Sequence, residues 1–155
     1  NYPRPMLEFM FETTRAIANL ILKGTLTKFP NIKIIVPHAG AVIPMLLDRV
    51  IALSPVLGLP APLQRGPTFS LLQNLYFDLA GSPVPYQLGT LLQVADPKKI
   101  FYGSDMPFTP EPVAKHLIQV LQETDLLNPA LRNAIWRDNA LALFPRFGVA
   151  DETKP

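Results

Sequence analysis

The sequence contains no cysteine, which excludes disulfides, thiolate metal sites and a cysteine nucleophile. The lack of disulfides is what we expect of a cytoplasmic protein. No uninterrupted apolar run approaches the roughly 18 residues that a membrane-spanning helix needs, so we expect no membrane partner. Neither sign of charge dominates, because 14 basic and 12 acidic residues give a net charge of +2 without blocks. We therefore expect no nucleic-acid partner.

The composition is that of a folded domain. Of the 155 residues, 48% are apolar and 17% are charged, which predicts a single domain over residues 1–155 with a buried core. Proline is abundant, at 18 residues, yet no segment is of low complexity. The prolines separate short apolar segments, as is typical of many short alternating elements.

Hydrophobic periodicity predicts helices that alternate with short strands. An apolar stripe with Gly24 after it predicts a first helix over residues 6–23, and the stripe consists of Met6, Met10, Ile17 and Ile21. Further helices are expected over residues 42–53, 86–94, 112–123, 129–137 and 138–144, and strands over 32–36, 75–78 and 99–102.

Two of these segments carry more specific expectations. The β-branched run in residues 32–36 predicts a strand that is covered on both faces. Residues 54–67 contain four prolines and two glycines but remain apolar, so we interpret them as an ordered excursion or lid.

A polar residue stands at or after the end of each predicted strand. His38 follows the first strand, Asp78 ends the second, and Asp105 follows the third. Strands that alternate with helices run parallel, and chemistry gathers at their carboxyl ends. The predicted fold class is therefore α/β. Because a (β/α)₈ barrel needs eight strands and about 250 residues, we expect this chain, which starts at Asn1, to be part of something larger.

Four sequence blocks between residues 7 and 144 resemble one family. They are PNIKIIVPHAGAVIPMLLDRV, LYFDLAGS, KIFYGSDMPF and IWRDNALALFP. In this order they resemble the C-terminal part of the amidohydrolase-related (amidohydrolase 2) metalloenzymes, which include the aminocarboxymuconate-semialdehyde, 6-methylsalicylate and γ-resorcylate decarboxylases. The resemblance implies the C-terminal portion, about three β/α units, of a (β/α)₈ TIM barrel. The three strands would be the sixth, seventh and eighth, with the N-terminal strands absent from this chain.

The resemblance also implies one divalent metal ion, zinc or, alternatively, manganese. The family's ligands are a His-x-His pair on the first strand, a histidine on the fifth and the aspartate of the Gly-Ser-Asp block. Asp105 would be that metal ligand and a catalytic proton carrier, and His38 would be the catalytic histidine. No His-x-His occurs, and the only other histidine is His116, which we interpret as structural. We therefore expect an incomplete metal site here, with the other ligands upstream of Asn1.

Four further residues have two interpretations each. Asp78 either orients the group on a neighbouring strand or caps the turn that follows it. Arg49 either clamps a substrate carboxylate, in its own or a neighbouring subunit, or is a solvated charge on a helix. Met106 and Phe108 either bind substrate in a pocket or serve packing alone.

The resemblance implies a metal-dependent, non-oxidative decarboxylase, that is, a lyase acting on a small aromatic or unsaturated carboxylic acid. A metal-dependent hydrolase of an ester, lactone or amide is the first alternative. A non-catalytic fragment or interaction subunit is the second. Open strand edges promote association, so we also expect a homodimer or another partner that covers them.

Overall fold

The structure is a computed structural model that describes residues 2–148. Its helices and strands are, in chain order, α1 (Glu8–Leu22), α2 (Thr25–Lys28), β1 (Ile35–Val36), α3 (Ile43–Val56), α4 (Arg65–Asn74), β2 (Tyr76–Asp78), α5 (Tyr86–Val94), β3 (Ile100–Phe101), α6 (Glu111–Glu123), α7 (Pro129–Asn133) and α8 (Asn139–Leu143). A π-helical turn at Ala134–Asp138 joins α7 to α8. The predicted α/β alternation is confirmed.

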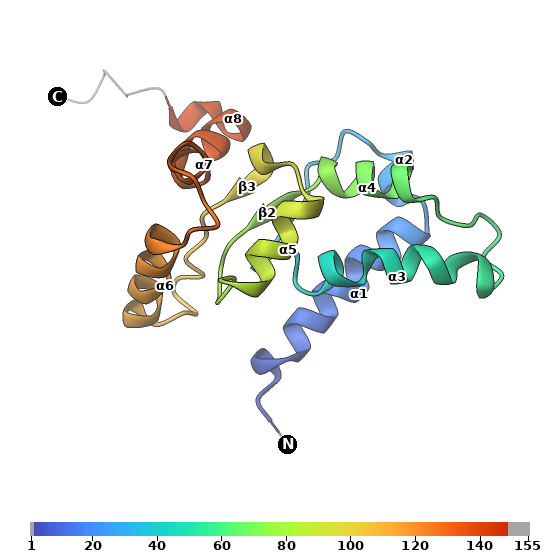
Figure 1. The fold of residues 1–155 in the computed structure, drawn as a ribbon, viewed down its shortest axis with the longest axis horizontal. Helices are drawn as coiled ribbons and strands as arrows, with labels where there is room; N and C mark the ends of the chain where they lie inside the picture. Colours follow the sequence, from blue (N-terminus) through green and yellow to red (C-terminus); the bar gives the residue numbers. More distant parts are fainter. Residues whose placement is uncertain (1, 149–155) are drawn as a thin grey trace.

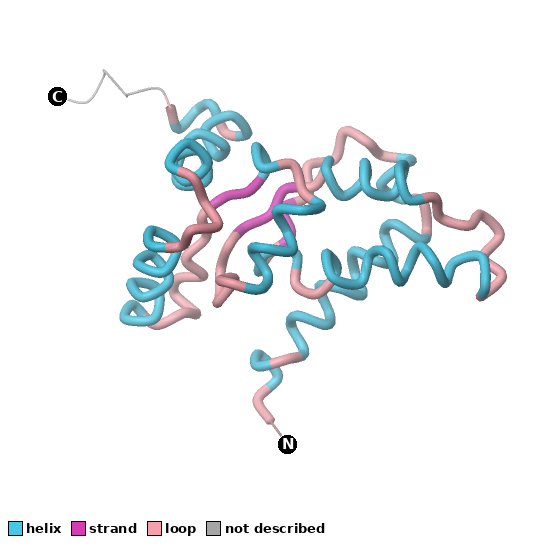
Figure 2. The backbone as a smooth tube through the Cα atoms, viewed as in Figure 1, coloured by secondary structure: helices cyan, strands magenta, loops and turns pink. Residues whose placement is uncertain are grey.

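The three strands form one parallel sheet in the order β1–β2–β3. Val36 pairs with Phe77, and Phe77 pairs with Ile100, so the three carboxyl ends lie at the same end of the sheet. Helices α1–α4 lie to one side of the sheet in Figure 1 and α6–α8 to the other, with α5 between them. Figure 2 shows how small the strand portion is within a mainly helical chain.

One face of the sheet builds the core. Val36, Phe77 and Ile100 share this face, and each is at most 1% exposed. Leucines from the surrounding helices complete the buried cluster, among them Leu47, Leu72, Leu88, Leu91 and Leu121. Burying each such side chain stabilises the fold by roughly 1.5–3 kcal/mol. This layer therefore fixes where the strands end, and with them the residues that follow.

The opposite face of the sheet is only partly covered. It carries Ile35, Tyr76, Asp78 and Phe101, and the ring of Tyr76 stacks on Phe101 with 5.5 Å between the centroids. Ile35 is 41% exposed. The prediction that the first strand is covered on both faces is therefore wrong within residues 2–148, because nothing in that range buries Ile35.

The first helix joins the core with only half of its predicted stripe. Ile17 and Ile21 are buried, whereas Met6 is 67% exposed and Met10 is half-buried. The C-terminal half of the stripe packs on the core, and its N-terminal half faces open space at the carboxyl end of the sheet.

The predicted excursion over residues 54–67 is shorter than expected. Helix α3 continues to Val56, and α4, which the sequence patterns do not predict, begins at Arg65. Gly66 and Pro67 indicate a loop, but proline is tolerated in the first turn of a helix, where its missing N–H costs nothing.

Among the described residues, His38–Val56 is long and apolar enough to cross a membrane by length and composition, with a mean hydropathy of 1.5. This stretch is interrupted, because His38–Gly40 forms a separate 3₁₀ turn and α3 has 14 residues. Ile43 and Leu47 are buried in the domain. The apolar character of α3 is thus explained in part by its place in the core, since 39% of the apolar window is buried.

Candidate active site

A cavity of about 920 Å³ lies at the carboxyl end of the sheet. Its polar lining consists of His38, Ser82, Gln87, Asp105 and Thr109. Its apolar lining, from the start of α1 and the connection between β3 and α6, includes Met6, Phe9, Met10, Phe108 and Val113. The structure thus brings His38 and Asp105, which follow different strands, to one cavity.

His38 lies in a tight turn directly after β1. Three residues with side chains, His38, Ala39 and Ala41, have φ values of 57°, 54° and 54°. Left-handed backbone costs roughly 1–2 kcal/mol for such a residue, so other contacts must offset this strain. Gly40, with φ 78°, is required by space as well, since a Cβ on it would lie 3.1 Å from the ring of Phe77.

Asp78, at the end of β2, holds the start of this turn. Its Oδ1 accepts the N–H of His38 at 2.9 Å and the N–H of Ala80 at 3.0 Å. One oxygen thus makes both contacts that the sequence presents as alternatives. Gly103 makes room for the carboxylate, because a Cβ there would lie 3.1 Å from the Cβ of Asp78. Hydrogen bonds to an ionised carboxylate are roughly twice as strong as neutral ones.

Gln87, on α5, holds the turn at its other end. Its Nε2 donates to the carbonyl oxygen of His38 at 3.4 Å and to that of Ala41 at 3.3 Å. The side chain is half-buried and lines the cavity. It therefore connects the turn after β1 with the helix that follows β2.

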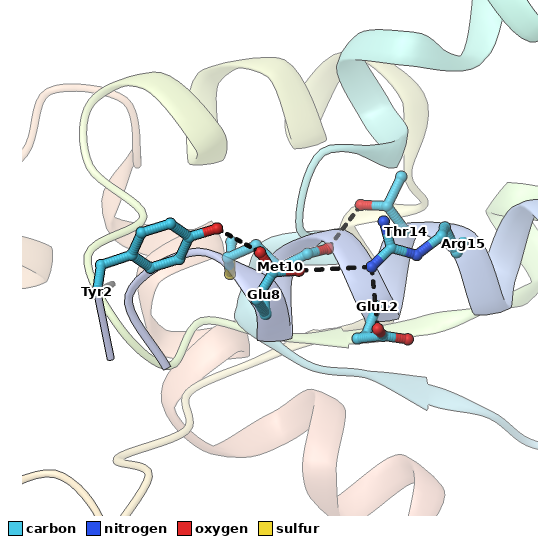
Figure 3. Close-up of polar contacts among 6 residues, drawn as sticks. All are labelled: Tyr2, Glu8, Met10, Glu12, Thr14 and Arg15. Atoms are coloured by element: carbon cyan, nitrogen blue, oxygen red, sulfur yellow. Dashed lines mark hydrogen bonds and ion pairs between the residues drawn. The ribbon is translucent and has the colours of Figure 1, made fainter. Parts of the chain in front are cut away.

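Thr14, on α1, provides a third anchor. Its Oγ1 accepts the N–H of Val42 at 3.1 Å. It also donates to the carbonyl oxygen of Met10 at 2.8 Å (Figure 3). Nearer the N-terminus, the hydroxyl of Tyr2 donates to Glu8, and this hydrogen bond, together with the charge of Glu8, raises the pKa of Tyr2. Polar contacts thus tie α1 to the end of the His38 turn and close its own first turns.

Asp105 lies in a loop that local contacts hold. Its φ is 58°, a left-handed value that aspartate adopts more readily than most residues. Its Oδ2 accepts the hydroxyl of Thr109 at 3.0 Å, and its carbonyl oxygen accepts the Thr109 N–H at 2.8 Å. Its Oδ1 accepts no hydrogen bond among residues 2–148, and Asp105 lines the cavity.

The other residues that the sequence singles out are all exposed. Phe108 lines the cavity but is 87% exposed, and Met106 is 52% exposed and outside the lining. Arg49 is exposed on α3, also outside the lining. His116 is exposed on α6. The substrate-binding roles of Arg49, Met106 and Phe108 stay predictions.

The residues present fit part of a metal site. Asp105 and His38 line one cavity, but residues 2–148 hold no group of three or more histidine, cysteine, aspartate or glutamate side chains that could bind a metal ion. Protein zinc sites use three or four protein ligands. Asp105 would therefore be one ligand of a larger set.

Sequence patterns do not single out three of the residues that build this site. Thr14 has a usable signal, since it is a polar residue within the apolar stripe of α1, and a buried hydroxyl needs a partner. Thr109 and Gln87 have none that we recognise. A glutamine that reaches a distant turn looks the same in sequence as one exposed to solvent.

Comparison with curated proteins identifies relatives over almost the whole chain. A family profile described as amidohydrolase matches residues 8–146. The 6-methylsalicylic acid decarboxylase of Penicillium expansum is 32% identical over 153 residues, which are 98% of this chain and 47% of that protein. Decarboxylase yanB of Aspergillus niger is 30% identical over 148 residues, 94% of this chain and 40% of that one. The chain thus spans about half the length of these relatives.

Solved structures show the same fold. A crystal structure of an amidohydrolase II superposes with a TM-score of 0.83 at 36% identity, over 92% of this chain and 45% of that one. A dihydroxybenzoic acid decarboxylase from Polaromonas sp. JS666, with bound manganese and the inhibitor 2-nitroresorcinol, gives a TM-score of 0.76 at 22% identity. The match covers 97% of this chain and 45% of that one. The resemblance expected from the four sequence blocks is confirmed, and the chain belongs to the amidohydrolase family.

Proposed function

We propose that this chain provides the C-terminal part of the active site of a non-oxidative decarboxylase, which removes CO₂ from a small aromatic or unsaturated carboxylic acid. The observation that carries this conclusion is the meeting of His38 and Asp105 in one cavity at the carboxyl ends of parallel strands. The names of the relatives, which include 6-methylsalicylic and dihydroxybenzoic acid decarboxylases, support an aromatic acid as substrate.

The cavity suits such a substrate in size and lining. Sites for small molecules commonly measure about 300–1,000 Å³ and combine apolar walls with a few polar groups. Here Phe9 and Met10 offer an apolar wall for a ring. His38 and Asp105 offer polar groups for the carboxylate and for a hydroxyl beside it.

The proposed reaction needs one proton at one carbon. The bond between the substrate carbon and its carboxyl carbon breaks, CO₂ leaves, and the electron pair stays on the substrate carbon. A proton then takes the place of the carboxyl group. We assign the delivery of this proton to Asp105 and hydrogen bonding or proton exchange with a substrate oxygen to His38, because an imidazole can both donate and accept a proton.

We propose a divalent metal, zinc or manganese, with Asp105 among its ligands. The free Oδ1 of Asp105 and the manganese bound in a structural relative support this. A bound ion would polarise a substrate oxygen. Because residues 2–148 supply only part of a ligand set, the remaining ligands would come from outside these residues.

We further propose that the sheet is about three β/α units of a (β/α)₈ barrel. The chain's coverage of 40–47% of its curated relatives supports this. The rest of the barrel would cover Ile35 and the open edges of β1 and β3. A homodimer would allow the exposed Arg49 to reach a neighbour's substrate.

The test is to sequence and express the intact gene and to supply its product with 6-methylsalicylic acid or a dihydroxybenzoic acid and Mn²⁺ or Zn²⁺. We expect one CO₂ released for each acid molecule consumed. Asp105→Asn and His38→Gln should each lower kcat by about 100-fold or more. The matched controls are Asp125→Asn and His116→Gln, at two exposed positions. Hydrolysis of an ester, lactone or amide without CO₂ release would contradict the proposal and favour the hydrolase.

A further inference from the structure

The turn after β1 needs continuous support to keep its shape. Three residues with side chains, His38, Ala39 and Ala41, share left-handed backbone within four positions. Such a run persists only where surrounding contacts over-determine it, and it is typical of functional sites. The position of the His38 imidazole therefore depends on the side chains that hold this turn.

Gln87 differs from the other side chains that hold this turn in the groups to which it donates hydrogen bonds. Asp78 accepts only one N–H from within the turn, that of His38, whereas Gln87 donates to carbonyl oxygens at both ends of the turn, those of His38 and Ala41. Both oxygens are acceptors, so the nitrogen of the amide must face them, and an amide nitrogen carries two N–H donors, enough for both carbonyls. A side chain of the same length without an N–H donor cannot replace it.

The imidazole of His38 also contacts the chain between β2 and α5. The ring of His38 packs against Gly81, where φ is 81° and a Cβ would lie 3.2 Å from the Cδ2 of His38. Gly81 lies in the connection from β2 to α5, and Gln87 lies in the first turn of α5. The chain from this connection into α5 therefore contacts both the backbone and the ring of His38.

We propose that Gln87 is a positioning residue that fixes the His38 imidazole in the cavity through the carbonyl oxygens of the His38–Ala41 turn. Gln87 need not touch the reacting atoms for this. The effect on turnover rests on the function proposed for His38. The effect on the geometry of His38 does not, and it can be measured on this chain alone.

The structural arm uses NMR on the 155-residue chain with isotope-labelled histidine. The sequence has two histidines, and His116→Asn assigns their signals. Gln87→Met keeps the length of the side chain and removes both donors. The control is Gln93→Met on the same helix, where the exposed Gln93 donates to the carbonyl oxygen of Gly89 at 3.3 Å. We expect Gln87→Met to shift or split the backbone and ring signals of His38, and Gln93→Met to leave them in place.

A second measurement needs no substitution. In the unmodified chain, the side-chain amide protons of Gln87 should exchange with solvent more slowly than those of Gln93, because two carbonyl oxygens of a distant turn hold them. Equal exchange of the two amides, or His38 signals that respond equally to Gln87→Met and Gln93→Met, would overturn the proposal.

The catalytic arm uses the product of the intact gene. We expect Gln87→Met to lower kcat for CO₂ release by about 10- to 100-fold, as misplaced catalytic groups do, with little change in KM. If the unmodified product releases no CO₂ but the His38 signals still respond to Gln87→Met, the proposed function fails and the positioning role stands. If kcat is unchanged although His38 moves, Gln87 has no catalytic consequence and the proposal is wrong.

Discussion

The two predicted catalytic residues share a cavity but are held in different ways. The His38 turn is fixed by Thr14, Asp78 and Gln87, which come from α1, β2 and α5. Asp105 is fixed by Thr109, four residues further along the same loop. Contacts from three separate elements therefore hold the histidine turn, whereas a single neighbouring residue holds the aspartate.

The largest effect on stability is expected when the carboxylate of Asp78, which accepts the N–H of His38, is removed. Asp78→Ala removes the acceptor for the N–H groups of His38 and Ala80, so we expect the free energy of unfolding to fall by about 2–4 kcal/mol. Urea denaturation of the chain measures this. Asp78→Asn keeps an oxygen acceptor and should cost less, and Asp105→Ala should cost less again. A loss from Asp105→Ala as large as that from Asp78→Ala would contradict the comparison.

A slightly smaller effect is expected from filling the space beside Asp78. In Gly103→Ala the new Cβ would lie 3.1 Å from the Cβ of Asp78, and such overpacking costs roughly 1–3 kcal/mol. Gly66→Ala is the matched control, because nothing lies within 4 Å of a Cβ at that position in α4. Thermal unfolding of both variants measures the difference. Equal melting temperatures for the two variants would show that Asp78 is not held tightly.

Substitutions at two threonines allow the stability of the two halves of the site, the His38 turn and the Asp105 loop, to be compared directly. Thr14→Val leaves the N–H of Val42 without its acceptor, and because Thr14 is 7% exposed we expect a loss of about 1–3 kcal/mol. Thr109→Val removes one hydroxyl from the more open Asp105 loop and should cost under about 1 kcal/mol. Denaturant unfolding measures both. The reverse order would mean that the Asp105 loop is the more strongly organised half.

The smallest effect is expected at Arg49. It is exposed and outside the cavity lining, so Arg49→Ala should change the stability of the chain by no more than about 0.5 kcal/mol. In the product of the intact gene, the same variant should raise KM for the acid if Arg49 clamps a carboxylate in an assembled enzyme. An unchanged KM would leave Arg49 as a solvated helix charge.

Sequence patterns predicted the parts of this structure that depend on local preference. A β-branched run located the first strand and short apolar segments located the other two, and the parallel arrangement placed His38 and Asp105 at the same end of the sheet. The support of His38 was not predictable in the same way, because His38, Ala39 and Ala41 are not residues that signal left-handed backbone. Without that turn, nothing in the sequence indicates that Gln87 should reach it.

A double-mutant cycle on CO₂ release by the intact product tests most directly whether His38 and Asp105 form one site. If both residues act on the same substrate, the double variant His38→Gln/Asp105→Asn should lose little more activity than the more damaged single variant, because residues that act as a unit are not additive. Losses in kcat that multiply in the double variant would show that the two residues act independently and would contradict the account.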